Sequence, residues 1–122
     1  QERQTTSEGD DRETSILRPR KEACTGEWTK EEKTTGWKQL NQEKDEPGKI
    51  YSIKKLAIAH CFSVKEGMDM VALLENEGSK IEIVKFIYPS LSDLENFDSF
   101  SDSFSSKSSW EAVGLYIDIK YK

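Results

Sequence analysis

The chain has a single histidine, His60, and only two cysteines, Cys24 and Cys61, among its 122 residues. One imidazole cannot build a metal site with several histidines, and the adjacent Cys61 would face the opposite side of a strand, so the two cannot form a Cys–His catalytic pair. The cysteines form neither a CxxC motif nor a zinc-ligand spacing. Carboxylates are numerous, but no pair is embedded in an apolar stretch, as acid–base catalysis requires. We therefore expect no enzyme, no metal site and no cofactor.

The chain also lacks long hydrophobic runs and glycosylation sequons. No window approaches the roughly 18 apolar residues of a membrane span, no signal peptide is visible, and N-x-S/T does not occur. These absences predict no membrane span and favour an intracellular over a secreted chain. In an oxidising compartment Cys24 and Cys61 could close one disulfide, whereas in a reducing one Cys61 would be a small buried residue. The compartment therefore stays open.

Apolar residues are few and unevenly distributed. Hydrophobic residues make up 34% of the chain and charged residues another 34%, with a mean hydropathy of -0.76. Residues 1–49 contain few aliphatic side chains, whereas residues 50–121 contain nearly all of them. A segment without apolar periodicity cannot offset the entropy of ordering. This distribution predicts a disordered N-terminal arm at residues 1–22 and a single β-rich domain at residues 23–122.

Four runs in the second half alternate apolar and polar residues, at 51–64, 68–75, 80–88 and 113–121. Alternation at every second position is typical of a strand with one face in a core. Gly67 and Gly78 lie between the first three runs, where hairpin turns need a glycine. The pattern predicts a mainly β (α+β) fold, with Ile58 and Ile117 as core residues at the centres of their strands.

One helix is expected before the last strand. Leu94, Phe97, Phe100 and Phe104 follow each other at spacings of three, three and four, which is typical of an amphipathic helix packed on the sheet. The same stretch contains Phe100-Ser101-Asp102-Ser103-Phe104, which resembles the F-x-D-x-F peptide that endocytic adaptor appendages bind. The packed helix is the favoured interpretation, and an exposed linear motif is the alternative.

The order of these elements resembles that of OB-type barrels over residues 36–122. A long bent strand, a three-strand meander, a helix and a closing strand agree with that order, although a fifth strand is missing. The fold is therefore expected to be a small antiparallel sheet or an OB-like barrel with one helix. Aromatic side chains beside lysines could stack unpaired bases, but a net charge of -5 opposes binding to phosphates.

We expect a non-enzymatic binding domain that acts through a protein partner. One alternative is an OB-like module that binds single-stranded nucleic acid, and another is a secreted effector or inhibitor with one disulfide. The candidate binding residues come from the first and third strands and from the phenylalanine-rich stretch: Tyr51, Lys54, Lys55, Lys85, Phe86, Phe100, Asp102 and Phe104. The oligomeric state is not predicted.

Overall fold

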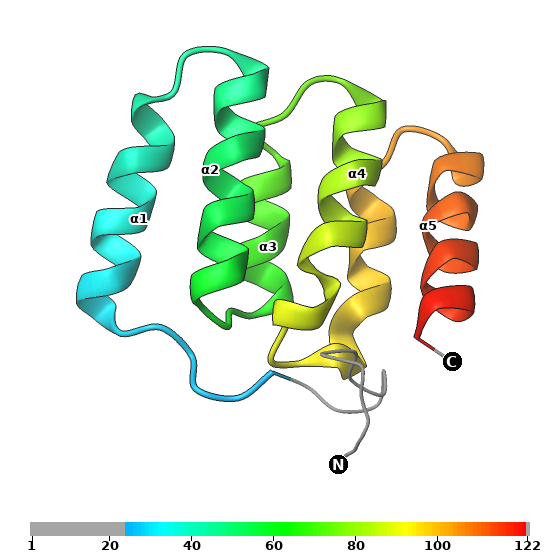
Figure 1. The fold of residues 1–122 in the computed structure, drawn as a ribbon. Helices are drawn as coiled ribbons and strands as arrows, with labels where there is room; N and C mark the ends of the chain where they lie inside the picture. Colours follow the sequence, from blue (N-terminus) through cyan, green and yellow to red (C-terminus); the bar gives the residue numbers. More distant parts are fainter. Residues whose placement is uncertain (1–23, 122) are drawn as a thin grey trace.

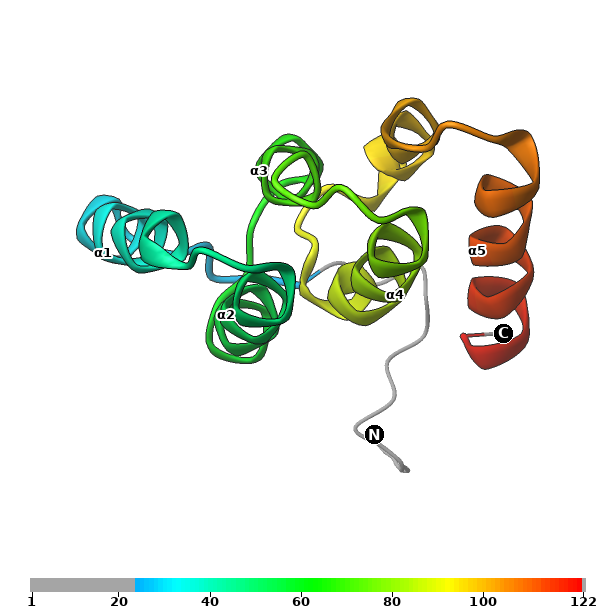
Figure 2. The same cartoon turned by 90° about the horizontal axis from the view of Figure 1, so that it is seen from above.

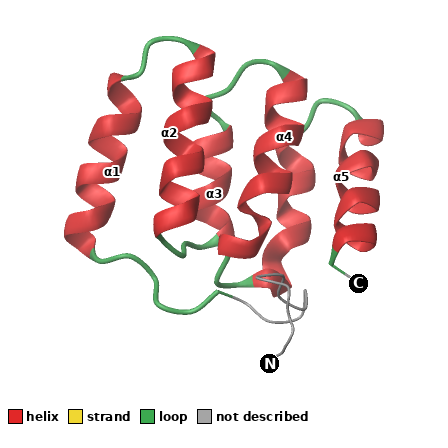
Figure 3. Cartoon of the chain, viewed as in Figure 1, coloured by secondary structure: helices red, strands yellow, loops and turns green. Residues whose placement is uncertain are grey.

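The computed structural model describes residues 24–121, and these residues form a helical domain (Figure 1). The elements in chain order are α1 (Lys30–Gln42), α2 (Glu46–Ala59), α3 (Val64–Val71), α4 (Glu77–Ile87), the 3-10 helices η2 (Tyr88–Ser90) and η3 (Leu94–Ser103), and α5 (Lys107–Lys120). Figure 3 shows helices and loops but no strand within this part of the chain. The predicted mainly β fold, with its antiparallel sheet or OB-like barrel, is therefore wrong. The predicted arm at residues 1–22 lies outside the described residues.

Successive helices run in alternating directions and stack as hairpins. Helix α2 packs on α1 and α4, α3 packs on α4 and η3, and α5 packs on α4 and η3. Viewed from above, α2 and α4 lie on one side of the domain, and α3 and η3 lie on the other (Figure 2). The core is the space between these two layers, because each helix directs its apolar stripe there. One side of α2 and α4 is therefore left uncovered by the other described helices.

Polar side chains determine where the helices begin. The side chain of the residue preceding each described α-helix accepts a hydrogen bond from the backbone N–H groups of the first turn; these residues are Thr29, Asp45, Ser63, Asn76 and Ser106. Thr29 and Ser63 form reciprocal capping boxes with Glu32 and Glu66. The segments around Gly67 and Gly78, predicted to be hairpin turns, are instead the first turns of α3 and α4.

The last helix shows why alternation was misleading. Val113, Ile117 and Tyr121 are buried, whereas Leu115 and Ile119 are exposed. Residues four apart lie on one side of a helix and also on one face of a strand, so the three buried residues fit both patterns. The two exposed apolar residues completed the alternation and produced the wrong strand assignment. The prediction that Ile117 is a core residue is confirmed.

Helix α2 gives the opposite result for Ile58. Its buried residues are Ile53, Leu56 and Ala57, and the helical turn carries Ile58 away from them. Ile58 is 77% exposed, so the prediction that it is a core residue is wrong.

The phenylalanine-rich stretch folds as η3 and packs on the core. Phe100 is fully buried, and Leu94, Phe97 and Phe104 are partly buried against the core. The Phe97 ring lies 5.5 Å from the Phe100 ring and 5.5 Å from that of Trp110, between centroids. The packed stripe predicted for this stretch is present, as a 3-10 helix.

A disulfide joins the segment before α1 to the end of α2. Cys24 and Cys61 are bonded, with their Cα atoms 5.7 Å apart. The neighbouring Trp28 N–H donates to the Cys61 carbonyl at 3.2 Å, and the Trp28 side chain is buried in the core. The disulfide and Trp28 together fix the start of α1 against the rest of the domain.

Candidate functional site

The described residues with large, exposed apolar side chains are confined to three helices. Tyr51 and Ile58 of α2 are 63% and 77% exposed, Phe86 of α4 is 38% exposed, and Leu115 and Ile119 of α5 are 63% and 69% exposed. In Figure 1, α2 and α4 lie in front of α3 and η3, so no other described helix covers this side. An exposed apolar group is ordinary when it stands alone, but several on adjacent helices indicate an interaction surface.

Lysines lie among these apolar residues, each above an aromatic ring. The ammonium nitrogen of Lys54 lies 5.1 Å from the centre of the Phe86 ring, and that of Lys55 lies 5.4 Å from the Tyr51 ring. The first contact connects α2 to α4. Cation–π pairs of this kind contribute about 0.5–1 kcal/mol each at exposed sites.

Two further contacts share the Tyr116 ring of α5, and one of them connects α4 to α5. Lys85 of α4 lies 4.8 Å and Lys120 of α5 lies 5.8 Å from the centre of the Tyr116 ring. The surface is thus continuous across three helices. We call it the lysine–aromatic face, and it comprises Tyr51, Lys54, Lys55, Ile58, Lys85, Phe86, Tyr116 and Lys120.

A shallow cleft of about 370 Å³ lies within this face, between α4 and α5. Ile81, Phe86 and Tyr116 supply most of its apolar lining, and Lys85 and Glu82 supply the charges. Glu82 forms an ion pair with Lys54 of α2. The cleft can therefore accept an apolar side chain while a charged group remains at its edge.

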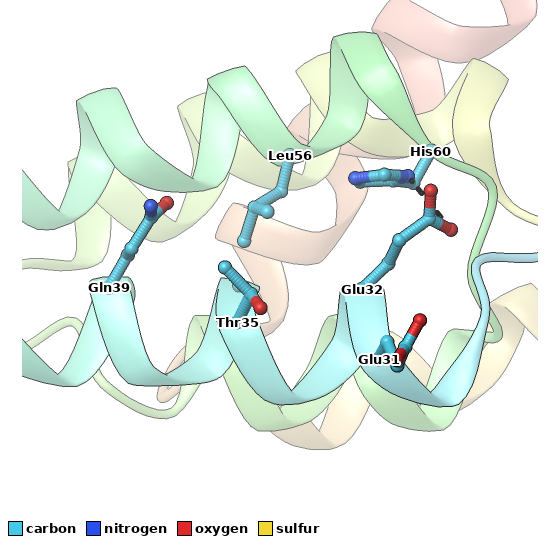
Figure 4. Close-up of a pocket in the computed structure, with 7 residues that line it drawn as sticks. Glu31, Glu32, Thr35, Gln39, Leu56 and His60 are labelled. Atoms are coloured by element: carbon cyan, nitrogen blue, oxygen red, sulfur yellow. Dashed lines mark ion pairs between the residues drawn. The ribbon is translucent and has the colours of Figure 1, made fainter.

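A second cleft of about 250 Å³ separates α1 from α2 and is shown in Figure 4. Leu56 of α2 and His60, directly after α2, face Glu32 and Thr35 of α1 across it, and the His60 Nδ1 atom lies 3.8 Å from a Glu32 carboxylate oxygen. A hydrogen bond from the Thr29 N–H lowers the pKa of Glu32, and the His60 ring contributes in the same direction. The cleft thus places one imidazole beside one carboxylate at the junction of α1 and α2.

A partly buried hydrogen-bond network connects the N-terminal end of α1 to α3. The Trp28 indole N–H and the Lys33 ammonium both contact the Glu66 carboxylate, at 3.3 Å and 2.9 Å. Burial alone would raise the pKa of Glu66, but the Ser63 N–H, Lys33 and Trp28 together lower it. This network holds α1 to α3, and none of its residues belongs to the lysine–aromatic face.

Residues 24–121 contain neither a membrane-spanning helix nor a cluster of metal-ligating side chains. No helix in this range has the length and apolar character needed to cross a membrane. No three side chains of the His, Cys, Asp or Glu type in the same range lie close enough together to share a metal ion.

The structure brings five of the eight predicted binding residues together. Tyr51, Lys54, Lys55, Lys85 and Phe86 all lie on the lysine–aromatic face, although they come from helices and not from the predicted strands.

Three predicted binding residues, two in η3 and one directly after it, lie apart from that face. Phe100, Asp102 and Phe104 belong to the other layer, and Phe100 is fully buried, so it is not accessible to a partner in this structure. Ile58, Tyr116 and Lys120 also lie on the face but were not among the predicted binding residues. A helical phase would have placed Ile58 beside Lys55, because residues three apart share one side of a helix but lie on opposite faces of a strand.

The fold and the face together define a small domain of stacked helical hairpins with a cationic, aromatic and aliphatic surface. A family model described as a domain of unknown function (DUF4476) matches residues 37–113, and the chain belongs to this family. The match extends from within α1 to within α5 and so includes α2 and α4 in full. No curated protein and no solved structure matches the chain.

Proposed function

We propose that this domain binds a protein partner, without catalysis, through the lysine–aromatic face. The observation that supports the proposal is that Tyr51, Ile58 and Phe86, three of the five large apolar side chains exposed in the described part of the chain, belong to this face. Protein interfaces have apolar and aromatic side chains at their centre and charged side chains at their rim. Ile58 and Phe86, with lysines beside them, have this arrangement.

Binding of single-stranded nucleic acid is the weaker alternative. Its OB-like framework is absent from residues 24–121. Such binders stack bases on open aromatic faces, but the ammonium groups of Lys55, Lys54 and Lys85 lie over the rings of Tyr51, Phe86 and Tyr116. A base would have to displace a lysine before it could stack.

The disulfide supports a second proposal, which concerns the compartment. Cys24 and Cys61 are bonded, and disulfides persist mainly in oxidising environments. A secreted effector or inhibitor would therefore use the same face outside the cell. Free-thiol counting on protein from its native source tests this: two free thiols would contradict it.

Site-specific cross-linking tests the proposed binding face. A photo-cross-linking amino acid is placed at position 58 on the face, and at position 41 of α1 as the control. A partner captured only from position 58 is then purified and titrated against the wild type, Ile58→Ser and Asn41→Ser. We expect Ile58→Ser to weaken binding by roughly tenfold or more and Asn41→Ser to leave it unchanged. Equal capture at both positions, or equal affinities, would contradict the proposal.

A further inference from the structure

The lysine–aromatic face carries unpaired positive charge. Lys55, Lys85 and Lys120 have no carboxylate of the described residues within ion-pair distance, whereas Lys54 is paired with Glu82. The chain as a whole has a net charge of -5. This face is therefore positively charged although the chain as a whole is negative, and the charge lies on the same face as the exposed side chains of Tyr51, Ile58 and Phe86.

We propose that the partner presents an acidic amphipathic helix to this face. This inference rests on the proposed function and adds the chemistry of the bound segment. The carboxylates of such a helix would pair with Lys55, Lys85 and Lys120, and its apolar side chains would contact Ile58 and enter the cleft between α4 and α5. Opposite charges favour both the rate of encounter and the orientation of the two surfaces.

The aromatic rings make these lysines suited to the task. Each ammonium group lies over a ring within 6 Å of its centre, and this contact restricts a side chain that would otherwise lose much conformational freedom on binding. Lys55 and Lys120 are exposed and Lys85 is half-buried, so a carboxylate can still reach these side chains from solvent. The lysines are therefore partly ordered before the partner arrives.

The shape of the surface favours a helix over an extended segment. The described residues offer no sheet edge to which a strand could add. A shallow groove between two helices with apolar walls is the kind of surface that receives the apolar stripe of a third helix. At about 370 Å³, the cleft is at the lower end of the range for ligand pockets, about 300–1,000 Å³, and suits one anchoring side chain.

Three labelled probes test the inference with the full chain. The first is a peptide of about 18 residues whose leucines follow helical spacing and whose remaining positions are mostly glutamate. The second has lysine in place of each glutamate, and the third is a single-stranded oligothymidine. We expect the acidic peptide to bind roughly tenfold or more tightly than the basic one, with an affinity that falls as salt is added.

Charge reversal on the face provides the matched comparison. The double variant Lys55→Glu/Lys120→Glu should lose about tenfold in affinity for the acidic peptide, whereas Lys38→Glu/Lys65→Glu, with the same change of charge on α1 and α3, should bind as the wild type does. Circular dichroism confirms that the variants are folded. Equal loss in the two double variants would overturn the inference, because only the net charge of the chain would then matter.

The outcomes separate this inference from the proposed function. If the acidic peptide binds no better than the basic one, or neither binds, the acidic helix is refuted. The protein-binding function still stands in that case when the cross-linker at position 58 captures a partner through a segment that is not acidic. Preferential binding of the oligothymidine, lost in Lys55→Glu/Lys120→Glu, would overturn both proposals.

Discussion

Replacing Phe100 by alanine should destabilise the domain strongly. The Phe100 side chain is fully buried between η3 and α3. Its Cζ atom lies 2.9 Å from the position that a Cβ atom would take on Gly67 of α3, so the ring packs directly on the backbone of that helix. Truncation removes a full aromatic contact and leaves a cavity that two helices cannot easily close. Phenylalanine-to-alanine changes in such positions cost about 3–5 kcal/mol of unfolding free energy.

Urea denaturation followed by circular dichroism measures this loss, and substitutions of Phe104 and Asp102 serve as comparisons. Phe104→Ala should cost about 1–2 kcal/mol, because that side chain is only partly buried. Asp102→Asn, at an exposed position, should change stability by less than about 0.5 kcal/mol. A loss below about 1 kcal/mol for Phe100→Ala would refute the packing argument. The Phe100–Phe104 segment would then be accessible as an F-x-D-x-F motif, contrary to the structure.

Three further predictions test other parts of the structure. The Cys24–Cys61 disulfide closes a separation of 37 residues, so replacing both cysteines by serine should lower the unfolding free energy by about 4 kcal/mol on loop-entropy grounds, and an unchanged urea midpoint would contradict this. Gly36→Ala should lower the unfolding free energy by about 1 kcal/mol or more, because the new Cβ would lie 2.9 Å from Leu56 Cδ2. Gly114→Ala should instead raise it by about 0.5–1 kcal/mol, because no atom lies within 4 Å of the new Cβ and alanine favours a helix over glycine. The folded pKa of Glu66 is lower than its ordinary value of 4.5, so its carboxylate stabilises the fold above that pH and loses this effect as the pH falls through the folded pKa. Glu66→Gln should therefore reduce the fall in stability between about pH 5 and pH 3, and an identical pH profile would contradict the network around this residue.

The local signals for helix starts are present in the sequence. Gly78 lies in a predicted hairpin turn and Ser63 lies inside a predicted strand, yet Ser63 and Asn76, two residues before Gly78, both cap helices. The spacing from Ser63 to Glu66 is that of a capping box, and the same box occurs from Thr29 to Glu32. These signals need only neighbouring residues, because a side chain satisfies backbone N–H groups within one turn. The sequence by itself therefore contained enough information to locate the helix starts.

Tertiary structure decided which apolar residues are buried. In α5, burial of Val113 and Ile117 with exposure of Leu115 and Ile119 depends on where α4 and η3 lie. Positions 113, 117 and 121 satisfy a strand and a helix equally, because residues four apart share one side in both. Only the contacts between helices distinguish the helix from the strand, because they determine which side of α5 is buried.

The kinds of residue in the candidate site were predictable from the sequence, but their arrangement in space was not. Tyr51, Lys54, Lys55, Lys85 and Phe86 were identified from aromatic residues with lysines beside them, and this chemistry is readable from sequence alone. Their assembly into one face depends on α2 packing against α4, which brings Lys54 over the Phe86 ring, and on α4 packing against α5. Phe100 belonged to the same chemical class and is buried, because η3 packs on α3. Sequence thus determined the kinds of side chain available, and the packing of the helices determined which of them reach the surface together.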